Sequence, residues 1–148
     1  PDEARAFTAP DPITDKIGQN VADFLAADMR RGIIPPTFLP LQSGVGNVAN
    51  AVLASVGRST IIPPFKMHTE VLQDTVVELM KQGRCLFASS CCIHVCDETL
   101  QEIYQTFDFY RSKILLRPVE VSNNPAIARQ TAEYVIEDAH DSSVILWE

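Results

Sequence analysis

The sequence predicts an α/β domain with a largely parallel, open sheet and flanking helices. Short apolar runs alternate with segments of helical periodicity along the 148 residues, a pattern typical of parallel strands joined by helical crossovers. Glycines, prolines and asparagines mark the turns between them. The hydrophobic content of 46% is ample for one core of this size.

The first helix is expected to begin at Asp11 and Pro12, which suit an N-cap and a first helical position. The residues before it, within the range 1–12, include prolines and acidic side chains typical of an exposed linker. Arg30 and Arg31 complement the helix dipole at the other end, and Gly32 permits a left-handed cap. The spacing predicts one inward apolar face of Ile13, Ile17, Val21, Phe24, Leu25 and Met29.

Two strand-to-helix units follow. The apolar run from Thr37 to Gln42 predicts a strand, and the turn after it leads into a helix from Val48 to Val56 that Gly57 ends. The extended run from Phe65 to His68 then gives way at Glu70 to a second helical pattern, whose apolar members are Leu72, Val76, Leu79 and Met80.

The remaining elements continue this alternation. They comprise a strand at about Cys85 to Ala88, a loop through the next serines and cysteines, a helix from Asp97 to Phe107 with Leu100, Ile103, Tyr104 and Phe107 inward, a strand from Ile114 to Val121, a helix from Pro125 to about Ala139 and a final strand from Val144 to Trp147.

Four chemically informative segments each follow a predicted strand: Gly44 to Asn47, Glu70, Ser89-Ser90 and Asn123. The carboxyl ends of parallel strands share one edge, so these segments are expected to converge on a pocket. A carboxylate beside backbone donors and a carboxamide suits acyl transfer, in which the carboxylate attacks, amides hold the oxyanion and the asparagine positions the carbonyl.

Structural alternatives stay open for each segment. Glu70 at a helix start also suits an N-cap or a charge that complements the dipole. Gly44 and Gly46 suit a tight turn that needs positive φ, and Asn123 suits an Asx-type turn before Pro125. Residue spacing alone does not separate these roles from catalysis.

Composition excludes several function classes. The formal charge of -7, with basic residues only scattered, argues against a nucleic-acid surface. No apolar run approaches the roughly 20 residues of a membrane-spanning helix, and no charged leader precedes an apolar block. We therefore expect a soluble domain without nucleic-acid or membrane partners.

Four cysteines, Cys85, Cys91, Cys92 and Cys96, fall within one short region. Adjacent Cys91 and Cys92 would anchor a disulfide framework poorly, which predicts reduced thiols in an intracellular compartment. Cys92, Cys96 and His94 could supply zinc ligands, but the spacing is not a paired Cys-x-x-Cys motif, so no metal is expected.

Four motifs in order resemble the acetyl-CoA hydrolase/transferase family, and most closely its succinyl-CoA:acetate CoA-transferases and the fungal members named acetyl-CoA hydrolases. The resemblance runs from about Ala6 to about Gln130. Its motifs are LPLQSGVGNVANAVL at 39–53, TEVLQD at 69–74, FYRSKI at 109–114 and VSNNP at 121–125.

This resemblance implies a CoA-transferase-like fold in which Glu70 is the nucleophile and Asn123 the active-site asparagine. It also implies that Gly44, Val45, Gly46 and Asn47 contribute to an acyl-CoA pocket. Coenzyme A would enter as the acyl-CoA substrate, and acetate or succinate would serve as small carboxylate partners.

Two departures from the family shape the expected organisation. Family members are several times longer, with a preceding domain of similar fold and a later Gly-x-Gly-Gly segment that helps to bind CoA. We therefore expect a linker over 1–12, part of the family's second domain over 13–130 and a divergent tail over 131–148.

The same departures leave the function of the chain open. The alternatives to a CoA-transferase are a plain hydrolase, in which water resolves the thioester, and a non-catalytic structural or interaction domain. Apolar surface left by absent neighbours would favour a homo-oligomer or association with other chains. The expected compartment is mitochondrial or cytoplasmic.

Overall fold

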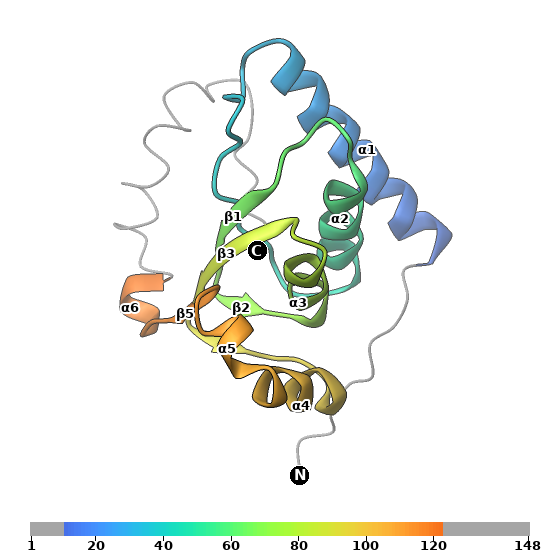
Figure 1. The fold of residues 1–148 in the computed structure, drawn as a ribbon. Helices are drawn as coiled ribbons and strands as arrows, with labels where there is room; N and C mark the ends of the chain where they lie inside the picture. The colour runs from blue at the N-terminus through green and yellow to red at the C-terminus, as the bar shows by residue number, and fades with distance from the viewer. Residues whose placement is uncertain (1–10, 123–148) are drawn as a thin grey trace.

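The computed structural model describes residues 11–122. Asn123, the helix expected from Pro125, the strand expected from Val144 and the tail over 131–148 lie outside the described residues. The elements, drawn in Figure 1, are α1 (Pro12–Arg30), α2 (Asn47–Arg58), β1 (Phe65–His68), β2 (Val71–Leu72), α3 (Asp74–Lys81), β3 (Cys85–Ser90), β4 (Cys92–Ile93), α4 (Asp97–Gln105), α5 (Phe107–Tyr110), β5 (Ile114–Leu116) and α6 (Val119–Ser122).

The main sheet is parallel and has the order β1-β3-β5. The α2 and α3 helices lie on one side of β1 and β3, and α1 lies outside α2 (Figure 1). A second, two-stranded parallel sheet joins β2 to β4. The predicted α/β class with a parallel open sheet and flanking helices is thus confirmed. Within residues 11–122, no helix combines the length and apolar character needed to span a bilayer.

The register of β1 on β3 contains one irregularity. Phe65 pairs with Cys85, but Lys66 pairs with Phe87, so β3 carries one extra residue at this point. Beyond it, the pairing continues evenly to His68 opposite Ser89. Such a bulge offsets everything that follows on one strand by one residue.

The core lies between the sheet and its helices. Side chains from β1, α3 and β3 are almost fully buried there and pack against α2 and the inner face of α1. Its most deeply buried members are Ala22, Leu53, Val56, Ile62, Phe65, Met67, Leu72, Val76, Val77, Met80, Cys85, Ala88 and Tyr110.

The expected start and end of α1 are confirmed. Asp11 is the N-cap, and its Oδ1 accepts hydrogen bonds from the amides of Ile13 (2.8 Å) and Thr14 (3.1 Å). Gly32 has φ +75 just past the helix end, where the left-handed conformation is least costly for glycine.

The predicted inward face of α1 is confirmed for Leu25, which is buried, and for Val21 and Met29, which pack partly buried against the core, but it is wrong for the other three residues. Ile13 and Phe24 are 73% and 48% exposed, and Ile17 is also exposed. The most buried residues of α1 are small residues, one leucine and one aspartate: Gly18, Ala22, Leu25, Ala26 and Asp28. Small residues let two helices approach closely, and a Cβ added to Gly18 would lie 2.4 Å from the carbonyl oxygen of Ala51.

Gly57 does not end α2, which continues to Arg58. A Cβ at Gly57 would lie 2.2 Å from Cδ2 of Leu79. The residue therefore serves the packing of α2 on α3, and the expectation of a glycine stop was wrong because helix packing overrides the local signal.

The expected strand from Thr37 to Gln42 is reduced to a single bridge. Leu41 pairs in parallel with Met67. The Leu41 amide donates to Lys66 O (2.9 Å), and the Leu41 carbonyl accepts from His68 N (3.1 Å). Pro40 has no amide to donate, and Phe38 has φ +56. These two features prevent a regular strand.

Residues 69–93 also differ from expectation. Leu72 lies in β2, and α3 begins only at Asp74, with Gln73 as its N-cap. The serines expected in a loop end β3, and Cys92 of the loop begins β4. Pairing with β1 and β5 keeps the serines extended, and pairing of Val71-Leu72 with Cys92-Ile93 keeps the residues before α3 extended.

The predicted helix over Asp97 to Phe107 divides at Thr106, whose φ of -115 and ψ of 37 are not helical. Ile103 is buried as expected, but Tyr104 and Phe107 are 70% and 58% exposed. The buried aromatic is Tyr110, whose hydroxyl donates to Glu102 Oε1 at 2.8 Å.

The strand expected from Ile114 to Val121 ends at Leu116. Pro118 follows and cannot donate to a sheet ladder. The chain then forms the short α6 instead.

Replacement of Gly18 by alanine should destabilise the domain by about 1–3 kcal/mol, because the new methyl group meets backbone that cannot rotate away. Chemical denaturation would measure the change in unfolding free energy. Gly57→Ala is the matched control: its neighbour is a flexible Leu79 methyl group, so the cost should stay within about 1 kcal/mol. Equal losses in both variants would contradict the proposed packing.

Asp74 should make the fold acid-sensitive. Burial alone would raise its pKa, but hydrogen bonds from Thr99 and from the Cys96 side chain and amide outweigh burial and lower it from 3.8. A carboxyl group whose pKa is lower in the folded state stabilises the fold at pH values above its unfolded-state pKa. This stabilisation is lost as the pH falls through the folded-state pKa.

The melting temperature of wild type should therefore exceed that of Asp74→Asn at about pH 6 by more than it does at about pH 3. Asp108→Asn, at a side chain 92% exposed, is the control and should show little pH-dependent difference. A constant gap between wild type and Asp74→Asn at both pH values would argue against this role.

Candidate active site

The carboxyl ends of the parallel strands meet at one edge of the sheet. The amide of Thr69, after β1, donates to Ser89 O at the end of β3 (2.9 Å). The Thr69 hydroxyl donates to Ser43 O (2.9 Å), just beyond the Leu41 bridge. The structure thus brings together the Gly44 turn, Glu70 and the Ser89-Ser90 pair, while the fourth expected member, Asn123, lies outside the described residues.

Glu70 occupies the connection between β1 and β2 and is exposed. It does not cap a helix: Gln73 is the N-cap of α3, and Asp74 is the acid in its first turn. The capping alternative for Glu70 is therefore wrong, because the β2 strand separates this residue from the helix.

The backbone of Glu70 is held by the turn after β3. Its carbonyl oxygen accepts hydrogen bonds from Ser90 Oγ (2.7 Å) and from the amides of Cys91 (3.0 Å) and Cys92 (3.3 Å). The Cys91 thiol also lies 2.9 Å from this oxygen. Glu70 is therefore an exposed residue on a main chain that these hydrogen bonds hold in place.

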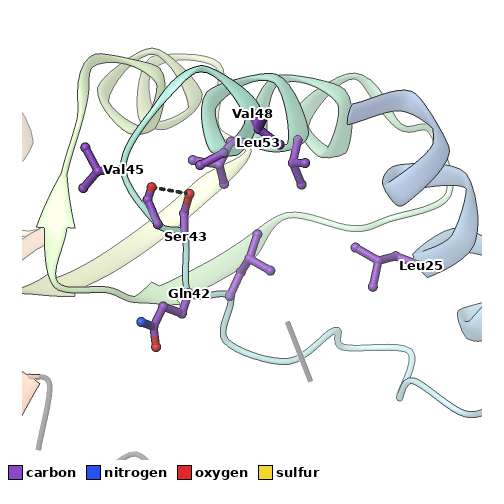
Figure 2. Close-up of a pocket in the computed structure, with 10 residues that line it drawn as sticks. Leu25, Gln42, Ser43, Val45, Val48 and Leu53 are labelled. Atoms are coloured by element: carbon purple, nitrogen blue, oxygen red, sulfur yellow. Dashed lines mark hydrogen bonds between the residues drawn. The ribbon is translucent and has the colours of Figure 1, made fainter. Parts of the chain in front are cut away.

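The Gly44 to Asn47 turn is fastened to the same edge. Gln73 Nε2 donates to Gly44 O at 3.0 Å, and Ser43 Oγ donates to the same oxygen at 3.2 Å, as the dashed line in Figure 2 shows. Gly46 has φ +122 and caps α2 without a side-chain hydrogen bond. Positive φ at Gly46 bears out the tight turn, and the uncapped helix start leaves backbone amides that can face an anion or oxyanion.

A cavity of about 110 Å³ lies beside this turn. Figure 2 shows side chains that line it, from α1, from the segment that leads into the turn and from α2. Its lining is mostly apolar and comprises Leu25, Leu41, Gln42, Ser43, Gly44, Val45, Val48, Ala49, Val52 and Leu53. Sequence reasoning found the turn but missed the contribution of Leu25, which comes from the packing of α1.

Two further polar atoms at this edge bear on the site, one on Ser89, which the sequence reasoning named, and one on His68, which it missed. His68 Nε2 and Ser89 Oγ are buried without a hydrogen-bond partner in the part of the chain that the structure describes, and the two residues are register partners on β1 and β3. Buried polar groups are usually paired. The signal in the sequence that could have pointed to His68 was its spacing from Glu70. The two residues are two positions apart, and side chains at this spacing share one face of a strand.

Two of the four cysteines, Cys91 and Cys92, lie beside Glu70. Burial is the main cause that raises the pKa of the Cys92 thiol, and the adjacent Cys91 and the Glu70 carboxylate raise it further. Burial raises the pKa of Cys85 to about 11. All four cysteines are free thiols, and residues 11–122 contain no group of three or more potential metal ligands.

Comparison with curated proteins finds relatives over most of the chain. It is 45% identical over 130 residues to propanoyl-CoA:succinate CoA transferase of Escherichia coli, a match that covers 88% of this chain and 26% of that protein. Succinyl-CoA:acetate CoA-transferase of Clostridium kluyveri is 40% identical, over 93% of this chain and 26% of the relative.

Acetyl-CoA hydrolase of Candida glabrata is 33% identical over 87% of this chain and 24% of its own length. The chain therefore spans about a quarter of the length of the curated relatives it matches. No protein-family model matches it.

Solved structures show the same fold. A 4-hydroxybutyrate CoA-transferase from Porphyromonas gingivalis matches with a TM-score of 0.54 at 20% identity, over 82% of this chain and 30% of that one. A RipA mutant matches with a TM-score of 0.57 at 19% identity, over 85% and 27% respectively.

Thr69→Val should lower the free energy of unfolding by about 1–3 kcal/mol, because it removes the hydroxyl that donates to the buried Ser43 carbonyl. Thr75→Val is a matched control, since the Thr75 hydroxyl is buried without a partner among residues 11–122. Its removal should be neutral within about 0.5 kcal/mol or stabilising. Urea denaturation would measure the free energy of unfolding of both variants. A similar decrease in both would contradict a specific role for the Thr69 hydroxyl.

Proposed function

Because the chain is homologous, over most of its length, to a segment of the acetyl-CoA hydrolase/transferase family, we propose that it carries the nucleophile, Glu70, of a CoA-transferase. The observation that supports this proposal is the exposed Glu70 on a fixed backbone beside the Gly44 turn. A carboxylate nucleophile needs both access to substrate and a defined position.

The proposed reaction moves CoA through covalent intermediates on Glu70. Its carboxylate attacks the acyl-CoA thioester carbonyl, and the CoA thiolate leaves an acyl-glutamyl anhydride. The thiolate then attacks the glutamyl carbonyl, which releases the first carboxylate and leaves a glutamyl-CoA thioester. An acceptor carboxylate then attacks the glutamyl-CoA thioester, the CoA thiolate leaves and attacks the acceptor acyl carbonyl of the new anhydride, and a new acyl-CoA and free Glu70 result, so the activation of the thioester is conserved throughout.

The Gly44 to Asn47 turn is proposed to support the acyl-CoA end of this reaction. Backbone amides at the start of α2 are suited to a developing oxyanion, and Gly46 lets the backbone approach closely because it has no side chain. The adjoining cavity has an apolar lining that suits a short acyl chain or part of the CoA arm. Asn123 is proposed to position the reacting carbonyl.

The substrates and the compartment are proposals of the same kind. The relatives are named for propanoyl-CoA, succinyl-CoA, succinate and acetate, so we propose an acyl-CoA donor and a small carboxylate acceptor for this chain. Free thiols suit a reducing intracellular compartment, mitochondrial or cytoplasmic. Hydrolysis would use the same nucleophile, with water in place of the acceptor.

A non-catalytic scaffold is the second candidate, and exposed apolar side chains favour it. Ile13 on α1 and Tyr104 on α4 are 73% and 70% exposed, and Phe107 is 58% exposed. Apolar surface of this kind is typical of contacts with other domains or chains. In this alternative the fold would serve association, and Glu70 would have no chemical role.

Incubation of the purified chain with propanoyl-CoA or succinyl-CoA should yield a CoA adduct on Glu70, detected by intact mass and removed by borohydride, which reduces thioesters. Glu70→Gln should abolish the adduct completely, because an amide does not act as this nucleophile. Glu98→Gln, at an exposed glutamate on α4, is the control and should react like wild type.

An unmodified mass in wild type would count against catalysis by this chain and favour the scaffold. An adduct that persists in Glu70→Gln would place the modification on another nucleophile. The neighbouring Cys91 and Cys92 thiols would then be the first to examine.

A further inference from the structure

We propose that Ser90 is a positioning residue for Glu70, which acts by holding the main chain from which the nucleophilic carboxylate rises. The inference rests on the proposed function of Glu70. It assigns to a buried hydroxyl group, rather than to a group that touches substrate, the task of fixing the nucleophile.

The Ser90 hydroxyl lies between two carbonyl groups. Its Oγ is 2.7 Å from the carbonyl oxygen of Glu70 and 2.9 Å from that of Cys92. A serine hydroxyl has a single proton, so the two oxygens share one donor. This donor links the β1–β2 connection to the start of β4.

Burial makes this link strong and costly to lose. Ser90 is 0% exposed, so its hydroxyl is withdrawn from bulk water. Hydrogen bonds are electrostatically stronger in such a low-dielectric setting, and an unpaired polar group there is correspondingly unfavourable.

The backbone on both sides of Glu70 is independently anchored. Before it, the Thr69 amide donates to Ser89 O at 2.9 Å. After it, β2 pairs with β4 through Val71-Cys92 and Leu72-Ile93. The Glu70 peptide lies between these anchors. The hydrogen bond from Ser90 to its carbonyl therefore fixes the orientation of this peptide group, and with it the orientation of the Glu70 side chain.

The hydroxyl is therefore expected to govern reactivity more than folding. The amides of Cys91 and Cys92 also donate to the Glu70 carbonyl, and they would retain the turn without Ser90. A looser Glu70 would still bind acyl-CoA but would spend less time in the attacking geometry. Misplacement of a reacting group by a fraction of an ångström lowers rate rather than affinity.

The test compares single-turnover formation of the Glu70 adduct in excess propanoyl-CoA across serine variants. Ser90→Ala should lower the saturated rate about tenfold and leave the half-saturating concentration within about twofold of wild type. Ser90→Cys, with a weak donor of similar size, should recover part of the rate. Ser55→Ala is the control, because Ser55 is equally buried in α2 and its hydroxyl accepts from Arg58.

A wild-type rate in Ser90→Ala, or an equal loss in Ser55→Ala, would overturn the proposal. If Ser90→Ala does not fold, the same comparison is made with Ser90→Cys, and a rate equal to that of wild type overturns the proposal.

A second readout does not depend on activity. Amide hydrogen exchange at Cys91 and Cys92, together with the carbonyl carbon shift of Glu70, reports directly on this hydrogen-bonded turn in NMR spectra. Ser90→Ala should speed exchange and move the carbonyl shift. If the wild-type chain forms no adduct, the proposed function fails, and unchanged NMR parameters would then separately overturn the role of Ser90.

Discussion

The hydrogen bond from the Thr69 amide to Ser89 O is the interaction on which the site depends. It continues the parallel pairing of β1 and β3 to the carboxyl edge of the sheet and brings the two following turns together. The Glu70 carbonyl then meets Ser90, and the Thr69 hydroxyl meets Ser43. Three segments distant in sequence are thus held by hydrogen bonds to main-chain carbonyls, two of them from side-chain hydroxyls, while Glu70 stays exposed.

Close packing of α1 on α2 stabilises the part of this arrangement that lies at the start of α2. Gly18 lets α1 approach the backbone of α2, and α2 carries the Gly44 turn at its start. Leu25 of α1 reaches the cavity beside that turn. The shape of the cavity therefore depends on a helix contact remote from Glu70, and residues of that contact contribute to the cavity wall.

Much of the architecture was predictable from the sequence because its signals are local. Asp11 and Pro12 mark a helix start by hydrogen-bonding capacity and fixed φ, and Phe65–His68 has the composition of a strand. The convergence of Gly44, Glu70 and Ser90 at one edge followed from parallel topology alone. The inward face of α1 was not predictable in this way, because large apolar residues compete with a glycine contact that only tertiary packing reveals. The interruption between Glu70 and α3 likewise depends on pairing of Val71-Leu72 with Cys92-Ile93, which lie far along the chain.

The extra residue in β3 decides which side chain serves Glu70. Without the offset between Phe65 and Lys66, Ser89 would stand beside Thr69 instead of His68, and every later β3 side chain would project from the opposite face of the sheet. Ser90 would then no longer reach the Glu70 carbonyl. The bulge thus compensates for the unequal lengths of the two strands. The position of the Ser90 hydroxyl beside Glu70 is set about one strand length away, by the number of residues in β3 rather than by their chemistry.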